Sequence, residues 1–231
     1  RSNVKLKMQD FNAKNAVYSG NIISEGFNIG KLIKQPILGS IALNVAVSGQ
    51  TFDPNNASVN LKGKINRFDV NDYSYQNIDV EGVLAKKKFD GKVLVTDPNL
   101  ALAFYGNIDF SQPQLHINAT ANLLQSNLQA LKFTKDSVLA TADFDLNYIG
   151  NNIDDFSGFA KLYNINLVRN KNRIDIDSVN LQSTTADGKK LLVLESNDVT
   201  ARIAGNYQLT SLPYSVQYFV AGYLPNYIKK P

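Results

Sequence analysis

The sequence predicts an all-β fold: a long, curled antiparallel sheet that forms an open groove, with one or two short helices. The first observation behind this prediction is a period of two in hydrophobicity, clearest where Leu100, Leu102, Phe104 and Ile108 alternate with wetter residues. That period is typical of a strand with one apolar face. The second observation is that turn clusters such as Asp97-Pro98-Asn99 bracket these runs, where proline is tolerated.

The third observation concerns glycine. Several glycines stand inside the predicted strands, each in the apolar row: Gly63, Gly82, Gly106, Gly158 and Gly205. Glycine weakens a strand and often marks a bend or a close approach of two backbones. Because these glycines recur in phase, we expect the sheet to curl towards its apolar side and to leave room along it. Such an apolar lining either packs against itself or holds acyl chains.

In the first part of the chain, the alternation predicts strands over 4–8, 16–24, 41–47, 59–70, 78–84, 89–95, 100–110 and 115–123. The alternation breaks over 27–33, where a helical turn is expected. Residues 124–133 allow two interpretations. Leu124, Leu128 and Leu131 have helical spacing, but a bulged strand also fits them.

The remaining strands are predicted over 140–148, 156–162, 174–181, 192–194 and 199–207, with turns at 151–155 and 185–188. The last segment changes character. Ser211 is a suitable N-cap, and an apolar stripe of Leu212, Val216, Val220 and Tyr223 predicts a short amphipathic helix.

An internal repeat organises these elements. Gly49 followed by Phe52-Asp53 resembles Gly150 followed by Ile153-Asp154, an offset of about 100 residues. We therefore divide the chain into the end of a preceding repeat (1–35), a first β-groove repeat (36–135), a second repeat (136–210) and a helical C-terminal segment (211–231). Because the chain opens within an alternating pattern, we interpret it as a fragment of a longer protein, with any membrane anchor outside it.

Composition excludes several kinds of site. The chain has no cysteine and one histidine, which rules out disulfides and thiolate metal sites and makes a zinc site improbable. The net charge of +4 is too small and too dispersed to indicate nucleic-acid binding. His116 and the carboxylates of Asp143, Asp145, Asp175 and Asp177 are expected on solvated strand faces. We expect no cofactor, no metal and no enzymatic activity.

A longer pattern resembles a known family. It runs from Phe89-Asp90-Gly91 through Asp97-Pro98-Asn99-Leu100, Phe104-Tyr105-Gly106 and Ile108-Asp109-Phe110-Ser111 to Ile153-Asp154-Asp155-Phe156-Ser157-Gly158. It is similar to TamB-like proteins, which are grouped with AsmA-like proteins as repeating β-groove proteins of Gram-negative bacteria.

The resemblance implies a periplasmic protein anchored in the inner membrane, with a hydrophobic groove that conducts phospholipid towards the outer membrane. It also implies a link to an outer-membrane barrel of the BamA type, and hence to outer-membrane protein assembly and secretion. The expected partners are therefore phospholipid and, through regions outside this fragment, that barrel.

The candidate functional surface is the apolar row. Its expected groove-lining residues are Leu43, Val45, Val59, Leu61, Ile78, Val80, Leu100, Leu102, Phe104, Ile108, Leu115, Ile117, Phe144, Leu146, Val199 and Ile203. Two lysine clusters, 86–88 and 189–190, either line one rim of the groove and meet lipid phosphates or form solvated bends that guard a sheet edge. The alternative function is a scaffold that hands β-strands to an outer-membrane barrel by edge pairing.

Overall fold

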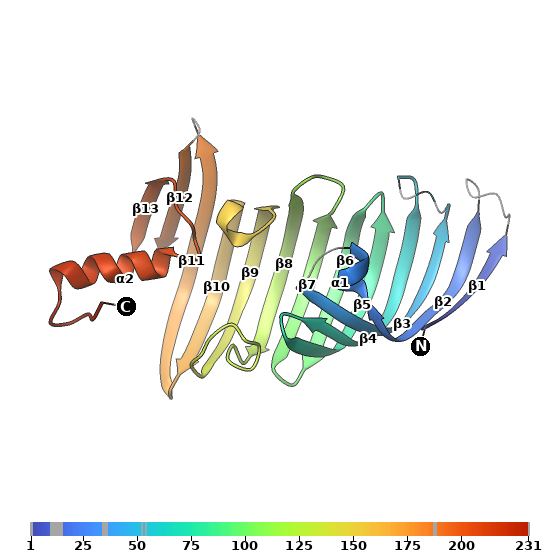
Figure 1. Cartoon of the computed structure of the whole chain (residues 1–231), viewed down its shortest axis with the longest axis horizontal. Helices are drawn as coiled ribbons and strands as arrows, with labels where there is room; N and C mark the ends of the chain where they lie inside the picture. Colours follow the sequence, from blue (N-terminus) through green and yellow to red (C-terminus); the bar gives the residue numbers. More distant parts are fainter. Residues whose placement is uncertain are drawn as a thin grey trace.

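One antiparallel sheet accounts for almost the whole structure (Figure 1). The computed structural model describes residues 2–9, 16–33, 37–51, 53, 55–186 and 189–230. Within these ranges, thirteen strands form the sheet in strict chain order, from β1 at one end to β13 at the other. The sheet is not closed into a barrel, since β1 and β13 do not pair. The predicted all-β class with an open, curled antiparallel sheet is confirmed.

The strands are long, most of them 10 to 15 residues. They are β1 (Ser2–Gln9), β2 (Val17–Asn28), β3 (Leu38–Gln50), β4 (Ser58–Val70), β5 (Tyr73–Ala85), β6 (Lys88–Asp97), β7 (Leu100–Asp109), β8 (Leu115–Ser126), β9 (Val138–Gly150), β10 (Ser157–Arg169), β11 (Asn172–Ala186), β12 (Lys189–Ser196) and β13 (Thr200–Gly205). The helical elements are α1 (Ile29–Ile33), the short 3-10 turn η1 (Ile153–Asp155) and α2 (Leu212–Tyr223).

Tight turns join several of the strands that are neighbours in sequence. Three hairpins turn on two residues that both have positive φ: Asn71-Asp72, Lys86-Lys87 and Asn170-Lys171. Positive φ at both central positions is the type I′ geometry, whose twist matches that of the flanking strands. Of the predicted turn at 185–188, residues 187–188 lie outside the described residues, and the two residues before them belong to β11.

The period of two is visible in the burial of the strands. In β3, Ile41, Val45 and Val47 are buried, whereas Asn44 and Ala46 between them are exposed. We call the side of the sheet that carries Val45, Val80, Phe104 and the other apolar residues that point the same way the apolar face. The other side is the polar face. Buried residues lie mainly on the apolar face, which is where the sheet keeps its core.

The helical interpretation of residues 124–133 is wrong. Strand β8 runs on to Ser126, whose hydroxyl donates to the carbonyl of Ala140 at 2.8 Å, and a series of turns follows. Within these turns the Leu131 amide donates to the Asn127 carbonyl at 3.0 Å, and the Leu131 side chain is only 2% exposed. Pairing with β9 therefore outweighs the local leucine spacing, and the buried leucine anchors the loop.

The C-terminal helix forms as predicted, but its details differ. The Ser211 hydroxyl makes no capping bond to the helix and instead donates to the Gln208 carbonyl at 3.1 Å. Along the predicted stripe, Leu212 and Val220 are half-buried, but Val216 is 51% exposed and Tyr223 is 74% exposed. The stripe is therefore only partly covered.

The proposed repeat boundaries do not interrupt the sheet. The boundary near residue 35 lies outside the described residues, and the boundary near 135 falls in the loop between β8 and β9, which pair directly. At the second copy of the repeated turn, Asn152 and Asp155 form a capping box around η1. The division into repeats remains a prediction about sequence rather than a division of the sheet.

A buried carboxylate fixes the turn between β6 and β7. Asp97 is 5% exposed, and it accepts hydrogen bonds from the Tyr73 hydroxyl, the Gln76 amide at 2.9 Å and the Asn99 amide at 2.8 Å. The sequence pattern identified this residue only as part of a turn. Its carboxylate in fact ties the start of β5 to the next hairpin.

Replacing this carboxylate should therefore destabilise the sheet. We expect Asp97→Ala to lower the free energy of unfolding by roughly 2–4 kcal/mol, because it leaves two backbone amides without their acceptor. Urea denaturation followed by circular dichroism measures this change. Asp90→Ala, at an exposed position of the same strand, should stay within about 0.5 kcal/mol. Equal effects of the two substitutions would contradict the role given to Asp97.

Candidate functional site

The apolar face is continuous because directly paired residues fall into rows that cross the strands. One row runs through Val45, Gly63, Val80, Val93, Phe104, Ala121 and Phe144. The next row runs through Val47, Leu61, Gly82, Gly91, Gly106, Ala119 and Leu146. No charged residue stands in either row, so the two rows form an unbroken apolar strip from β3 to β9.

Most of the predicted lining residues lie on this face. Val45 and Ile78 are each 6% exposed, while the others that stand in strands are half-buried. Val199 is the exception, because it closes the hairpin before β13 and is 54% exposed. The Ser196 amide donates to the Val199 carbonyl at 2.8 Å, and the Val199 amide donates to the Ser196 hydroxyl at 3.1 Å. Val199 therefore ends the row instead of lining it.

The prediction missed the contribution of β6. Phe89 and Val95 are buried on the apolar face, and Val93 stands in the row of Phe104. The signal was available, because these residues alternate with Asp90, Lys92 and other wetter positions. Phe89 has a specific role, since atoms of its ring lie 2.8 Å and 2.9 Å from where a Cβ would stand on Gly82 and Gly91. The ring therefore covers the two glycines.

A crease of small residues crosses the middle of the apolar face. Gly82 pairs with Gly91, Gly91 with Gly106, and Gly106 with Ala119. A Cβ on Gly106 would stand 2.3 Å from the Asn118 carbonyl oxygen and 2.5 Å from the Ala119 Cα. Such distances are too short for any side chain, so the backbones approach closely where the sequence predicted a bend.

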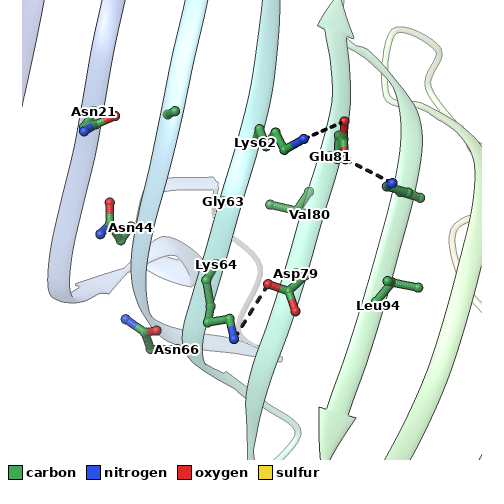
Figure 2. A pocket seen from close by; sticks show the side chains of 12 residues that line it. Asn21, Asn44, Lys62, Gly63, Lys64, Asn66, Asp79, Val80, Glu81 and Leu94 are labelled. Atoms are coloured by element: carbon green, nitrogen blue, oxygen red, sulfur yellow. Dashed lines mark hydrogen bonds and ion pairs between the residues drawn. The ribbon is translucent and has the colours of Figure 1, made fainter.

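The polar face is hollowed over β2 to β6. The hollow is about 600 Å³ and is lined chiefly by lysines, acidic residues and asparagines (Figure 2). Across it, Glu81 accepts from Lys62 at 3.2 Å and from Lys92 at 3.0 Å, and Lys64 lies 3.8 Å from Asp79. The two flanking lysines lower the pKa of Glu81, with Lys92 the larger cause.

These ion pairs join residues that stand directly opposite each other on neighbouring strands. All of these side chains are exposed, so solvent screens the ion pairs and each contributes little to stability. Their main effect is to keep this face wet. The two faces of the sheet are therefore chemically distinct.

The lysine clusters hold local structure. Lys88 forms an ion pair with Asp109 at 2.7 Å, and Lys190 donates to the Asp154 carbonyl at 2.6 Å. Lys86 and Lys87 make the two-residue turn between β5 and β6 and are exposed there. These contacts support the interpretation of the two clusters as bends at the ends of strands. The role of a lipid-facing rim remains a prediction.

The Lys88–Asp109 pair gives the sheet a pH dependence. Lys88 is the main cause that lowers the pKa of Asp109 to about 2, and hydrogen bonds from Ser111 also contribute. Because the folded pKa lies below that of the unfolded chain, this stabilisation is complete above about pH 4 and is lost as the pH falls towards 2.

Lys88→Met should therefore raise the Asp109 pKa towards its ordinary value and reduce the loss of stability between pH 4 and 2. Carboxyl carbon NMR titration measures the pKa, and urea denaturation at each pH measures the stability. Lys87→Met, in the adjacent turn, is the control and should leave the Asp109 pKa unchanged. An unchanged pKa in Lys88→Met would show that this ion pair is not its cause.

The other polar residues considered from sequence are engaged on the polar face. Asp143 accepts from Asn122 at 2.8 Å and Asn164 at 2.7 Å, and Asp177 accepts from Asn197 at 2.8 Å. Asp175 pairs with Arg173 at 2.9 Å. The single histidine, His116, is half-buried instead of exposed.

The described residues offer neither a clustered metal site nor a membrane-spanning helix. Nowhere in the described ranges do three or more His, Cys, Asp or Glu side chains gather as a metal site. No helix in the described part of the chain combines the length and the apolar character that a membrane span needs. Comparisons of the chain with protein-family models, curated proteins and solved structures found no match.

Proposed function

We propose that this chain is a segment of a TamB-like, periplasm-spanning protein whose apolar face carries the acyl chains of phospholipids between the inner and outer membranes. The observation that supports the proposal is the uninterrupted apolar strip on a single open sheet. A sheet that is apolar on one face and wet on the other suits an amphipathic cargo, because acyl chains need an apolar contact while headgroups need water.

The driving force is removal of apolar surface from water, at about 25 cal/mol per Å² or about 0.8 kcal/mol per methylene. Each strand from β3 to β9 contributes apolar residues to the same two rows, so an acyl chain that leaves one strand meets apolar contacts on the next. Sliding along the strip then requires no large change in contact area. The role needs no chemical step from any residue.

The crease provides space for the cargo at Gly106, whereas the Phe89 ring covers the other two glycines of the crease. Phe104 and Ile108 stand two residues before and two residues after Gly106 on the same face of β7. An acyl chain can lie over Gly106 with these larger side chains as flanking walls.

Native mass spectrometry of the purified chain tests the proposal, because co-purified phospholipid should appear as an added mass of a lipid. Photo-crosslinking locates the contact. A photoreactive residue at Leu102 should give lipid adducts, and one at Tyr105, on the polar face of the same strand, should not. Absence of lipid in both experiments would refute the proposal.

A second candidate rests on the sheet edges. Strand β1 pairs only with β2, so its other side offers unpaired backbone groups within the described residues. Such an edge can accept a further strand, as a scaffold for outer-membrane protein assembly would require. A photoreactive residue at Lys5 distinguishes the two functions: polypeptide adducts there, without lipid adducts at Leu102, would favour the scaffold.

A further inference from the structure

Helix α2 presents large side chains to solvent at the end of the sheet. Figure 1 shows that it lies beyond β13 and extends away from the strands. Its Tyr218 is 53% exposed, Phe219 63% and Tyr223 74%. Among the side chains of this helix that the structure describes, Ala221 is the buried one. An exposed aromatic cluster of this size indicates a surface with a partner.

The segment after α2 folds back and adds a cation to this surface. The Gln217 side chain donates to the Lys229 carbonyl at 3.1 Å, which brings the Lys230 ammonium to 5.2 Å from the centre of the Tyr218 ring. Tyr214, Tyr218, Tyr223 and Lys230 are among the residues around a hollow of about 500 Å³. Rings and a positive charge are thus exposed together, and we call them the α2 surface.

The positive charge of the α2 surface indicates which kind of partner it binds. No acidic residue follows Asp198, whereas Arg202, Lys229 and Lys230 are basic. Tyrosine favours the boundary between water and lipid, because its ring is apolar and its hydroxyl is polar. A second copy of the chain would bring like charges together, so an anionic lipid surface is the better complement.

The length of the helix indicates how it would bind. Twelve residues span about 18 Å, which is well short of the hydrocarbon core of about 30 Å. We propose that the α2 surface lies flat on the surface of a bilayer that contains anionic lipids, with its rings in the headgroup region and Lys229 and Lys230 facing phosphates. This contact is separate from the apolar face and places one end of the sheet at a membrane.

Vesicle sedimentation tests the proposal. The chain should co-sediment with large unilamellar vesicles of phosphatidylcholine and phosphatidylglycerol at a ratio of 3:1. The double variant Phe219→Ser/Tyr223→Ser should bind at least about tenfold more weakly, because two rings no longer leave water. Tyr105→Ser, which removes an exposed ring from the polar face, is the matched control and should bind like the unmodified chain.

The lysines provide a second, independent measurement. Lys229→Gln/Lys230→Gln should weaken binding to these vesicles by about fivefold per lysine and should have little effect on pure phosphatidylcholine vesicles. Circular dichroism verifies that each variant is folded. The Phe219→Ser/Tyr223→Ser variant should keep its co-purified phospholipid in native mass spectrometry, so failure of this proposal and failure of lipid carriage are distinguishable.

Three results would overturn the proposal. The first is no binding of the unmodified chain, and the second is equal binding by the Phe219→Ser/Tyr223→Ser variant. The third is a dimer, seen by light scattering, that this variant abolishes while vesicle binding is absent, since the α2 surface would then join two copies of the chain.

Discussion

A charge at the centre of the apolar face should abolish lipid binding while the sheet stays folded. We expect Phe104→Asp to reduce co-purified phospholipid at least about tenfold, since losing about 50 Å² of apolar contact at 25 cal/mol per Å² removes about 1.3 kcal/mol, and an unpaired carboxylate costs more. The cost in folding stability should be only about 1–3 kcal/mol, because Phe104 is half-buried and its carboxylate replacement keeps access to water.

Native mass spectrometry measures the lipid, and urea denaturation measures the stability. Two variants serve as controls. Phe104→Leu keeps the position apolar and should retain lipid, while Tyr105→Asp places the same charge on the polar face of β7. If Phe104→Asp lost its fold and its lipid together, the result would indicate that the apolar face is an ordinary hydrophobic core. It would contradict the proposal that this face carries lipid.

The crease predicts a large effect on stability. Gly106→Ala should lower the free energy of unfolding by roughly 2–4 kcal/mol, because the new methyl group would meet the Asn118 carbonyl and the Ala119 backbone at less than 3 Å. Both obstacles are backbone atoms of the paired strand, so neither can rotate away. The strands must separate, and the crease must flatten.

Gly26→Ala is the matched control, because nothing lies within 4 Å of its added Cβ. It should leave stability unchanged or raise it by up to about 1 kcal/mol, through the lower entropy of the unfolded chain. Urea denaturation measures both variants, and small-angle X-ray scattering reports any change in curl. Similar stabilities for the two variants would show that the close approach at Gly106 does not constrain the sheet.

Much of the fold could be predicted because strand alternation is a local signal. The strand of Leu100 to Asp109 and its neighbours follow from the period of two, and the tight hairpins follow from short turn clusters. Residues 124–133 could not be predicted, because leucine spacing there competes with pairing to β9 and with burial of Leu131. Local sequence does not record which of these contributions is larger.

For the candidate surface, too, some features could be predicted from local sequence and others depended on strand pairing. The rows of Val45 and Phe104 were visible as alternation, but the place of Val199 at the hairpin end depended on where β12 turns. Asp97 looked like a turn residue, and its role as a buried acceptor for Tyr73 appears only when β5 and β6 pair. Exposure of Tyr223 likewise depends on whether any strand covers α2.

The sequence by itself determined the all-β class, the apolar side of most strands and the glycines that stand on that side, because side-chain direction in a strand alternates with position. Only the tertiary structure decided that the strands form one open sheet, that three glycines meet in one crease and that α2 leaves its aromatic rings exposed. The physical reason is that register and covering depend on pairing between separate segments, and one-dimensional periodicity contains no information on those contacts.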